Sequence, residues 1–287
     1  MAYTNLMLKK VSTNENILID SFGRTINYLR ISVTDRCNQQ CIYCSPKGVF
    51  TKLPREDVVS FEEIYDFTNR AVSSGITKVK LTGGEPLVRR DVIYLVELLA
   101  SIQDINDFGM TTNGILLKKF SKQLKNAGLQ RINISLDTLR ADKYSLITKG
   151  GTINEVYEDI EAAQNAGLEP VKINCVVMPG INENEIDAMR KFCENAGLHL
   201  QFIHVMDLNQ KTLSENLHRI FSRPPKCELC NKLRLASNGD IFPCLYSNLY
   251  TSIRKSNSYL EALIKAVAIK PFTSNKSNFQ TMAEIGG

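Results

Sequence analysis

Apolar and polar positions alternate in two distinct rhythms between residues 28 and 206. Short apolar stretches with a period of two predict strands, and longer stretches with apolar residues three and four apart predict helices. The predicted strands are 28–33, 78–82, 108–112, 131–135, 170–178 and 199–206. The predicted helices begin at Ser60, cover 91–102, end near Ala127, and cover 154–166 and 183–196.

Two local signals support this assignment of helices and strands. Ser60-Phe-Glu-Glu63 has the form of a capping box, in which Ser and Glu side chains satisfy the first backbone amides of a helix. The tetrapeptide Asn-Ala-Gly-Leu occurs at 126–129, 165–168 and 195–198, each time between a predicted helix and a predicted strand. Glycine readily takes the left-handed conformation that ends a helix, so the repeat predicts one helix-to-strand turn used three times.

Six strands that alternate with helices indicate parallel pairing with right-handed crossovers. The pattern fits either a doubly wound sheet or a barrel, including an incomplete one. Both folds place the active site at the carboxyl ends of the strands, and we expect the motifs below to lie there. The regular alternation stops near Asp207, so the chain divides into residues 1–206 and 207–287.

Composition and charge exclude several classes of protein. The chain has 287 residues, 43% of them hydrophobic, which is enough for one sizeable core. Its net charge of +5 suits a small anionic substrate but not a dedicated nucleic-acid binder. We expect no membrane span, because no apolar run reaches about 18 residues. The amino terminus lacks the pattern of a secretory signal, so a cytoplasmic protein is expected.

Three of the eight cysteines follow the first predicted strand, as Cys37-x3-Cys41-x2-Cys44. Three thiolates at this spacing can bind three irons of a cubane iron–sulfur cluster and leave one iron open. A structural zinc site would need a fourth ligand, and no histidine is near in sequence. The spacing resembles that of radical S-adenosylmethionine (SAM) enzymes, whose open iron binds SAM. A zinc knuckle or a chance spacing is the alternative.

Three further motifs follow predicted strands. Thr82-Gly-Gly-Glu-Pro86 ends the second strand, and its two glycines allow the backbone to approach a ligand closely. Thr111-Thr-Asn-Gly114 ends the third strand, and Ser135-Leu-Asp137 ends the fourth. Either of these last two segments, taken alone, reads as an ordinary turn.

A second cysteine group has the spacing Cys227-x2-Cys230-x13-Cys244. No fourth cysteine follows it, so a second cluster with one open iron is plausible, and such an iron could bind substrate directly. A zinc site with a distant fourth ligand is the alternative. Cys175 and Cys193 lie in a predicted strand and a predicted helix, where we expect them to be core residues.

Several motifs together resemble one family, the GTP 3′,8-cyclases, radical SAM enzymes that begin molybdenum cofactor biosynthesis. The resemblance covers most of the chain and includes the terminal Gly286-Gly287. The matching segments are Leu29–Cys37, Lys80–Asp91, Arg131–Thr138, Pro170–Asn174 and Cys230–Leu235.

The resemblance implies an α/β fold, an incomplete (β/α)6 TIM-like barrel whose C-terminal region carries a second iron–sulfur cluster and closes the barrel mouth. It implies two 4Fe-4S clusters and SAM as cofactors. A 5′-deoxyadenosyl radical would remove the ribose 3′ hydrogen of GTP, and C3′ would then attack guanine C8. The second cluster would bind the guanine end, and the two terminal glycines would enter the active site.

The resemblance also assigns roles to individual residues. Arg30, Lys172, Gly286 and Gly287 are the expected catalytic residues. The expected SAM contacts are Tyr43, Gly83, Gly84, Glu85, Thr112, Asn113 and Ser135, with Glu85 accepting a bond from the SAM ammonium. The expected GTP contacts are Arg30, Lys78, Lys80, Lys172, Lys232 and Arg234, because a triphosphate needs several cations. The expected cluster ligands are Cys37, Cys41, Cys44, Cys227, Cys230 and Cys244.

The chain departs from the family pattern at positions that concern the substrate. Its sixth strand reads Gln201-Phe-Ile-His204 where the family has Arg-Phe-Ile-Glu, and Lys232 stands where the family has arginine. The segment 207–226 is also shorter than in the family. These changes leave open a paralogue that acts on a different nucleotide or a peptide.

The resemblance implies partners as well as chemistry. We expect GTP as substrate, a flavodoxin or ferredoxin as electron donor, cyclic pyranopterin monophosphate synthase as the next enzyme, and a possible homodimer. A zinc-dependent binding module, for instance for RNA, is an alternative of another class. The absence of tryptophan and of clustered basic and aromatic residues argues against that module.

Overall fold

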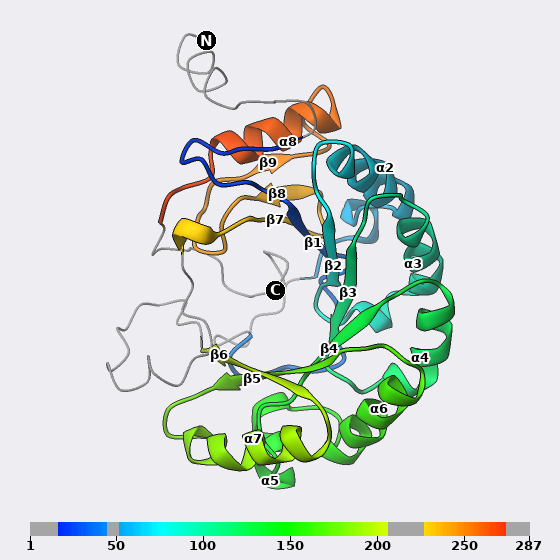
Figure 1. The fold of residues 1–287 in the computed structure, drawn as a ribbon, viewed down its shortest axis with the longest axis vertical. Coiled ribbons are helices and arrows are strands. Elements are labelled where there is room, and N and C mark those ends of the chain that lie inside the picture. Colours follow the sequence, from blue (N-terminus) through cyan, green and yellow to red (C-terminus); the bar gives the residue numbers. More distant parts are fainter. Residues whose placement is uncertain (1–16, 45–51, 206–226, 274–287) are drawn as a thin grey trace.

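Six parallel strands follow one another in chain order and form a curved sheet (Figure 1). The computed structural model describes residues 17–44, 52–205 and 227–273. Each strand pairs with the one before it. The strands are β1 (Tyr28–Ser32), β2 (Lys78–Thr82), β3 (Asp107–Thr112), β4 (Arg131–Ser135), β5 (Val171–Val177) and β6 (His199–His204).

Helices between successive strands cover the outer, convex side of this sheet (Figure 1). These helices are α2 (Phe61–Val72), α3 (Val92–Ala100), α4 (Leu117–Asn126), α5 (Ala141–Thr148), α6 (Ile153–Asn165) and α7 (Ile186–Asn195). Short 3-10 helices cover Arg55–Asp57, Pro86–Val88, Glu183–Glu185 and Cys227–Leu229. The chain therefore has an α/β fold with a mostly parallel sheet, consistent with a partial barrel. No helix in the described ranges is both long and apolar enough to cross a membrane.

The described part of the C-terminal region extends the same sheet beyond β1. Strand β7 (Lys232–Leu235) pairs parallel with β1, and β8 (Asp240–Phe242) and β9 (Thr251–Ser252) add two antiparallel pairings. Helix α8 (Tyr259–Ala268) packs beside α2. The expected closing of the barrel mouth also concerns residues 206–226 and 274–287, which lie outside the described residues.

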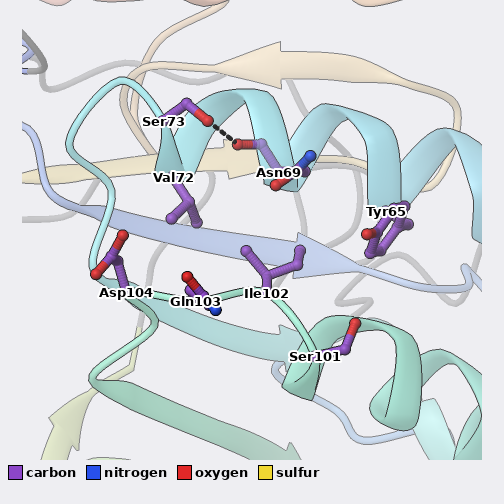
Figure 2. A pocket seen from close by; sticks show the side chains of 8 residues that line it. All are labelled: Tyr65, Asn69, Val72, Ser73, Ser101, Ile102, Gln103 and Asp104. Atoms are coloured by element: carbon purple, nitrogen blue, oxygen red, sulfur yellow. Dashed lines mark hydrogen bonds between the residues drawn. The ribbon is translucent and has the colours of Figure 1, made fainter.

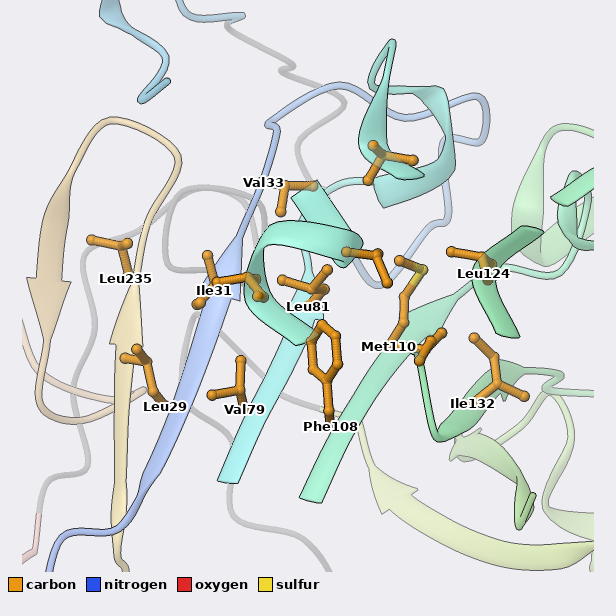
Figure 3. Packing of buried hydrophobic residues seen from close by; sticks show 14 of the residues in the cluster. Leu29, Ile31, Val33, Val79, Leu81, Phe108, Met110, Leu124, Ile132 and Leu235 are labelled. Carbon is orange, nitrogen blue, oxygen red and sulfur yellow. The ribbon is translucent and has the colours of Figure 1, made fainter. Parts of the chain in front are cut away.

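The core lies between the sheet and its outer helices. Figure 3 shows side chains from neighbouring strands in one cluster with Leu124 of α4, for example Ile31, Leu81 and Met110. All four of these side chains are fully buried. Successive side chains of a strand point to opposite faces, so the residues between these apolar ones face the concave side. That alternation directs Arg30, Lys80 and Arg131, together with other polar side chains, to the concave side.

The structure confirms most of the elements that the sequence predicts. Ser60 and Glu63 form the predicted capping box at the start of α2. Gly128, Gly167 and Gly197 of the repeated turn all have positive φ, at 98°, 73° and 67°. Each following leucine is buried in the core.

Some elements were not predicted from the sequence. Helix α5 is a short second helix between β4 and β5, and its amphipathic pattern is too weak to be recognised in the sequence. Strands β7 to β9 have two to four residues each, too few for a period of two to be recognised. Helix α8 did have a signal, since Ser258 caps it three residues before Glu261.

Candidate active site

The first cysteine group lies in the loop that follows β1, at the carboxyl ends of the strands. This loop is attached to the end of α5. The backbone amides of Gln40 and Ile42 donate to the carbonyl oxygens of Thr148 and Ile147, each at 2.9 Å. The side chain of Gln39 donates to the hydroxyl of Tyr144, at 2.8 Å, and to a carbonyl at residue 150. Helix α5, which the sequence did not predict, therefore holds the three-cysteine loop in place.

The Gly83-Gly84-Glu85 turn packs against the backbone that leads to Cys37. The amide of Gly84 donates to Thr34 at 2.7 Å, and the amide of Glu85 donates to Arg36 at 2.8 Å. A Cβ atom on Gly84 would lie 2.3 Å from the Arg36 carbonyl oxygen, and one on Gly83 would lie 2.6 Å from that of Thr34. In this structure the glycines allow two backbone segments to meet, and this contact fixes the start of the cysteine loop.

The carboxylate of Glu85 joins the ends of β2 and β3. It is fully buried and accepts hydrogen bonds from the Thr112 hydroxyl at 2.8 Å, the Asn113 amide at 2.7 Å and the Leu87 amide at 3.0 Å. Burial is the main cause that raises the pKa of Glu85 to about 7. A direct bond from Glu85 to the SAM ammonium stays a prediction.

Asn113 extends this connection to the cysteine loop. Its side-chain amide donates to the Asn38 side chain at 2.7 Å and approaches the Cys37 sulfur at 3.9 Å. Thr112, the last residue of β3, and Asn113, which follows it, therefore lie next to the first cysteine, at the place where the sequence predicts SAM contacts.

The two remaining predicted SAM contacts are Tyr43, which lies within the cysteine loop, and Ser135 on β4. Ser135 ends β4 and is partly exposed, and Asp137 two residues later is buried. Burial raises the pKa of Tyr43, and its neighbours Asp137 and Cys41 raise it further. Burial likewise raises the pKa of Asp137, to about 6. The carboxyl ends of β1, β2, β3 and β4 therefore bring the predicted SAM contacts together around the first cysteine group.

The side chains of the first group fit an iron–sulfur cluster. Cys37, Cys41 and Cys44 are free and partly exposed. Burial is the main cause that raises the pKa of Cys37 to about 11, and the nearby Cys44 contributes. Three thiols in one loop supply the donor set of a multi-iron cluster, because cysteine thiolates are the usual ligands of such clusters.

The second cysteine group lies at the opposite end of β1. Tyr28, the first residue of β1, pairs with Lys232, the first residue of β7, so Cys230 lies at the amino end of β1. Antiparallel β8 runs back to that same end, which brings Cys244 there as well. The expectation that all motifs lie at the carboxyl ends of the strands is therefore wrong for this group. The reason is that its cysteines precede β7 and follow an antiparallel strand.

The two cysteine groups are separated by roughly the length of β1. Its five residues, at about 3.3 Å each, separate the two ends by roughly 13 to 17 Å. A small molecule of nucleotide size can fit between groups at this distance. The remaining two cysteines, Cys175 and Cys193, are buried core residues, as predicted.

Basic side chains occupy the concave face between the two groups. Strand register places Arg234, Arg30 and Lys80 side by side on β7, β1 and β2. Lys80 and Arg234 are buried, Arg30 is partly buried, and Lys172 on β5 faces the same side. Burial lowers the pKa of Lys80 to about 6, and the nearby Arg131, Arg30 and Lys172 contribute. Burial and Arg30 lower the pKa of Arg234 to about 9. Such crowding of like charges favours a polyanionic ligand, because an anion relieves the repulsion.

A hydrogen-bonded network, not anticipated from the sequence, supports these cations. The Lys80 ammonium donates to the Asn133 side chain at 2.9 Å, and Asn133 in turn donates to Asn174 at 3.1 Å. Arg131 donates to Asp107 at 2.5 Å and to Asn133 at 3.1 Å. The one available signal was that Arg131 and Asn133 alternate with Ile132 and Ile134, which places them on the concave face.

The remaining predicted residues lie at the margins of this face. Lys78 and Lys232 are exposed at the amino ends of β2 and β7, and Lys232 lies 5.6 Å from the centre of the Tyr28 ring. Gln201 pairs with Asn174 on the neighbouring strand. His204 ends β6. Gly286, Gly287 and the short segment 207–226 lie outside the described residues.

A separate hollow lies on the outside of the fold, between the end of α2 and the loop after α3 (Figure 2). It is at the amino ends of β2 and β3, because both segments lead into those strands. Its lining contains one charged residue, Asp104, and no cysteine, so it has no connection with the cysteine groups. The lining residues are Tyr65, Asn69, Val72, Ser73, Ser101, Ile102, Gln103 and Asp104.

Comparison with known proteins assigns this chain to a family. The model of the radical SAM superfamily matches residues 31–193. The GTP 3′,8-cyclase of Thermodesulfovibrio yellowstonii is 38% identical, over 93% of this chain and 99% of that protein. The GTP 3′,8-cyclase of Petrotoga mobilis is 36% identical, over 94% of this chain and 100% of that protein.

Solved structures share the fold at low sequence identity. Streptococcus suis SuiB bound to its precursor peptide SuiA aligns with a TM-score of 0.69 and 16% identity, over 94% of this chain and 69% of SuiB. The structure of anSMEcpe with bound AdoMet aligns with a TM-score of 0.59 and 18% identity, over 86% of this chain and 81% of that one. At these identities the likeness concerns the fold alone.

Proposed function

The chain belongs to the GTP 3′,8-cyclase family, the radical SAM enzymes of molybdenum cofactor biosynthesis, and we propose that GTP binds on the concave face between two iron–sulfur clusters. The observation that carries this proposal is the position of the basic side chains. Arg30, Lys80 and Arg234 lie between a cysteine group at each end of β1. Family membership also decides against a zinc-dependent binding module.

The clusters and SAM supply the radical chemistry. When bound, a reduced 4Fe-4S cluster with one open iron cleaves SAM and yields the 5′-deoxyadenosyl radical that removes the ribose 3′ hydrogen of GTP. Cys37, Cys41 and Cys44 would hold that cluster, and Cys227, Cys230 and Cys244 would hold a second one at the guanine end. The protein's own contribution is to bind and orient the two substrates.

The chain's residues around the first cluster position SAM. Glu85 fixes Thr112 and Asn113 through one hydrogen bond from each, and a third hydrogen bond, from the Leu87 amide, holds Glu85 itself in place. We propose that these residues, with Tyr43 and Ser135, border the SAM site. Gly83 and Gly84 serve it by holding the cysteine loop against the end of β2.

The cations of the concave face bind the triphosphate. Arg30, Lys78, Lys80 and Lys172 supply positive charge from three strands, and Arg234 and Lys232 supply it from β7. Arg131 adds a guanidinium on β4, where it also pairs with Asp107. Arginine suits this role because its planar group can bind two phosphate oxygens at once.

Electron supply and product removal require partners outside this chain. We propose a flavodoxin or ferredoxin as reductant and cyclic pyranopterin monophosphate synthase as the consumer of the product. We also propose that Gly286 and Gly287 assist turnover. Deleting these two residues should then lower product formation while the iron content stays the same.

The test uses anaerobically reconstituted protein with SAM, a strong reductant and GTP deuterated at the 3′ carbon. The expected result is a cyclised GTP product, together with 5′-deoxyadenosine one mass unit heavier than from unlabelled GTP. ATP in place of GTP is the control for base recognition, and the Cys37→Ala variant is the control for radical formation. SAM cleavage that is unaffected by GTP, or deoxyadenosine without deuterium, would contradict the proposal and favour a paralogue with another substrate.

A further inference from the structure

A buried lysine lies against the second cysteine group. Lys270 follows α8 and is only 2% exposed. Its ammonium donates to the Cys230 sulfur at 3.4 Å, the Lys232 carbonyl at 2.8 Å and the Pro243 carbonyl at 2.5 Å. An ammonium has three hydrogens, so these three acceptors use all of them.

The three acceptors belong to the two segments that carry the cysteines. Cys230 and Lys232 lie at the start of β7, and Pro243 immediately precedes Cys244. A single side chain from a third segment therefore fixes the position of Cys230 relative to Cys244. The remaining cysteine is held in a similar way, since Arg24 donates to the Cys227 carbonyl at 2.6 Å.

The two cations differ in their charge balance. Arg24 is neutralised by Asp20 at 2.5 Å. In the part of the chain that the structure describes, Lys270 forms no ion pair with a carboxylate. A buried cation without a counter-charge is strongly unfavourable. The contact atom able to carry negative charge is the Cys230 sulfur, which becomes a thiolate when it binds a metal.

We propose that Lys270 is a positioning residue for the second cluster. It holds the Cys230 and Cys244 segments at the separation that ligation needs. It also gives the bound cluster an N–H···S hydrogen bond and a positive charge. Hydrogen bonds and charge at cluster sulfurs set the reduction potential, and a cation stabilises the more negative, reduced state. This inference rests on the proposed function, because it assumes that Cys227, Cys230 and Cys244 bind a cluster.

The test isolates the second cluster by replacing Cys37, Cys41 and Cys44 with alanine. In this background Lys270→Met removes both the charge and the hydrogen bonds, and Lys270→Gln keeps an amide donor without the charge. Lys265→Met on α8 is the matched control, because Lys265 pairs with Glu261 and touches no cysteine. Each reconstituted protein is assayed for iron and sulfide, for iron loss to a chelator, and for midpoint potential by EPR-monitored titration.

Lys270→Met should lose iron to the chelator about ten-fold faster or more, the scale seen when a residue supporting a metal ligand is removed. Its midpoint potential should shift to more negative values. Lys270→Gln should retain more iron but show the negative shift, and Lys265→Met should match the parent. If the protein that lacks Cys37, Cys41 and Cys44 but keeps Lys270 binds no iron, the second cluster itself is contradicted. A parent with a cluster, and Lys270 variants with unchanged potential and iron retention, would overturn the role of Lys270.

Discussion

The ammonium of Lys80 on β2 lies 2.9 Å from the side-chain oxygen of Asn133 on β4, across the intervening strand β3. The contact spans two strand spacings because β3 contributes Gly109 at this level, paired with both Lys80 and Arg131. Arg131 lies over Gly109, so close that an added Cβ would be 3.1 Å from its guanidinium. The glycine thus makes room for a cation of the proposed triphosphate site.

The Gly109→Val variant tests this arrangement. A valine side chain should displace Arg131 from β3 without straining the strand, since β-branched residues favour extended backbone. We expect KM for GTP to rise about 10- to 100-fold, the scale of a lost hydrogen bond to a charged group, with a smaller effect on kcat. Iron content should be unchanged. Steady-state kinetics checks this, and an unaltered KM would remove Arg131 from the proposed substrate site.

Lys80 should make GTP binding depend on pH. Its pKa in the free protein is about 6, because burial and the neighbouring cations disfavour its charge. Bound triphosphate favours the charged form and raises this pKa, so binding takes up a proton at pH values above about 6. Affinity should therefore fall as pH rises, by at most about ten-fold per unit.

Calorimetry at pH 8 without reductant measures the proton uptake. The apparent binding enthalpy should differ between Tris and HEPES buffers, because they have different ionisation enthalpies. Lys80→Arg should abolish the difference, since arginine stays protonated. Equal enthalpies for the unaltered protein in both buffers would contradict the prediction.

Glu85→Gln should disturb the SAM site without removing the first cluster. The glutamine amide group would face the Asn113 amide, so two donors would meet where a carboxylate now accepts. We expect SAM cleavage to fall about 10- to 100-fold, as for loss of a supporting hydrogen bond, while iron content stays within the range of the parent. Loss of iron in this variant would mean that Glu85 serves the cysteine loop instead.

The same substitution has a consequence for stability. Because the folded pKa of Glu85, about 7, is above its ordinary value of 4.5, the folded state holds this proton more tightly. The contribution of Glu85 to stability is present below about pH 4.5 and is lost as pH rises through 7. Glu85→Gln should thus make the melting temperature less dependent on pH between 5 and 8. An unchanged pH profile of Tm would argue against the raised pKa.

Gly84→Ala should damage the first cysteine group selectively. The new Cβ would lie 2.3 Å from a backbone oxygen of Arg36, which has no flexible end that can move away. We expect loss of about half the bound iron, from the cluster held by Cys37, Cys41 and Cys44. Gly23→Ala is the control for backbone strain without a steric clash, because Gly23 has a left-handed φ of +78° but a Cβ there meets nothing within 4 Å. Full iron content in Gly84→Ala would show that the loop tolerates the shift.

Substitutions in the two cysteine groups should affect different steps of the reaction. Replacing Cys37 with alanine should abolish 5′-deoxyadenosine formation, because the SAM-binding cluster loses a ligand. Replacing Cys230 should reduce cyclised product more than uncoupled SAM cleavage, because it lies at the other end of β1. Quantifying both products by mass spectrometry checks this. Equal loss of the two products in the Cys230 variant would argue against a substrate-binding role for that group.

The sequence by itself determined the features that depend on residues close together in the chain. The alternation of strands and helices, the capping box at Ser60 and the three Asn-Ala-Gly-Leu turns need only neighbours within a few positions. The first cysteine motif and the Gly83-Gly84-Glu85 turn are also local patterns. Their position after parallel strands was enough to predict that they meet at the carboxyl ends.

The tertiary structure alone decided what lies between and around these motifs. Lys80 and Asn133 are 53 residues apart in the chain, and Lys270 and Cys230 are 40 apart. Such pairs depend on strand register and helix packing, which no short pattern encodes. The position of the second cysteine group also depends on the pairing of β7 with β1. Strand β7 has only four residues, too few for its own pattern to predict it, and its neighbours in the sheet stabilise it. The polar face that joins the two cysteine groups is therefore a property of the assembled sheet.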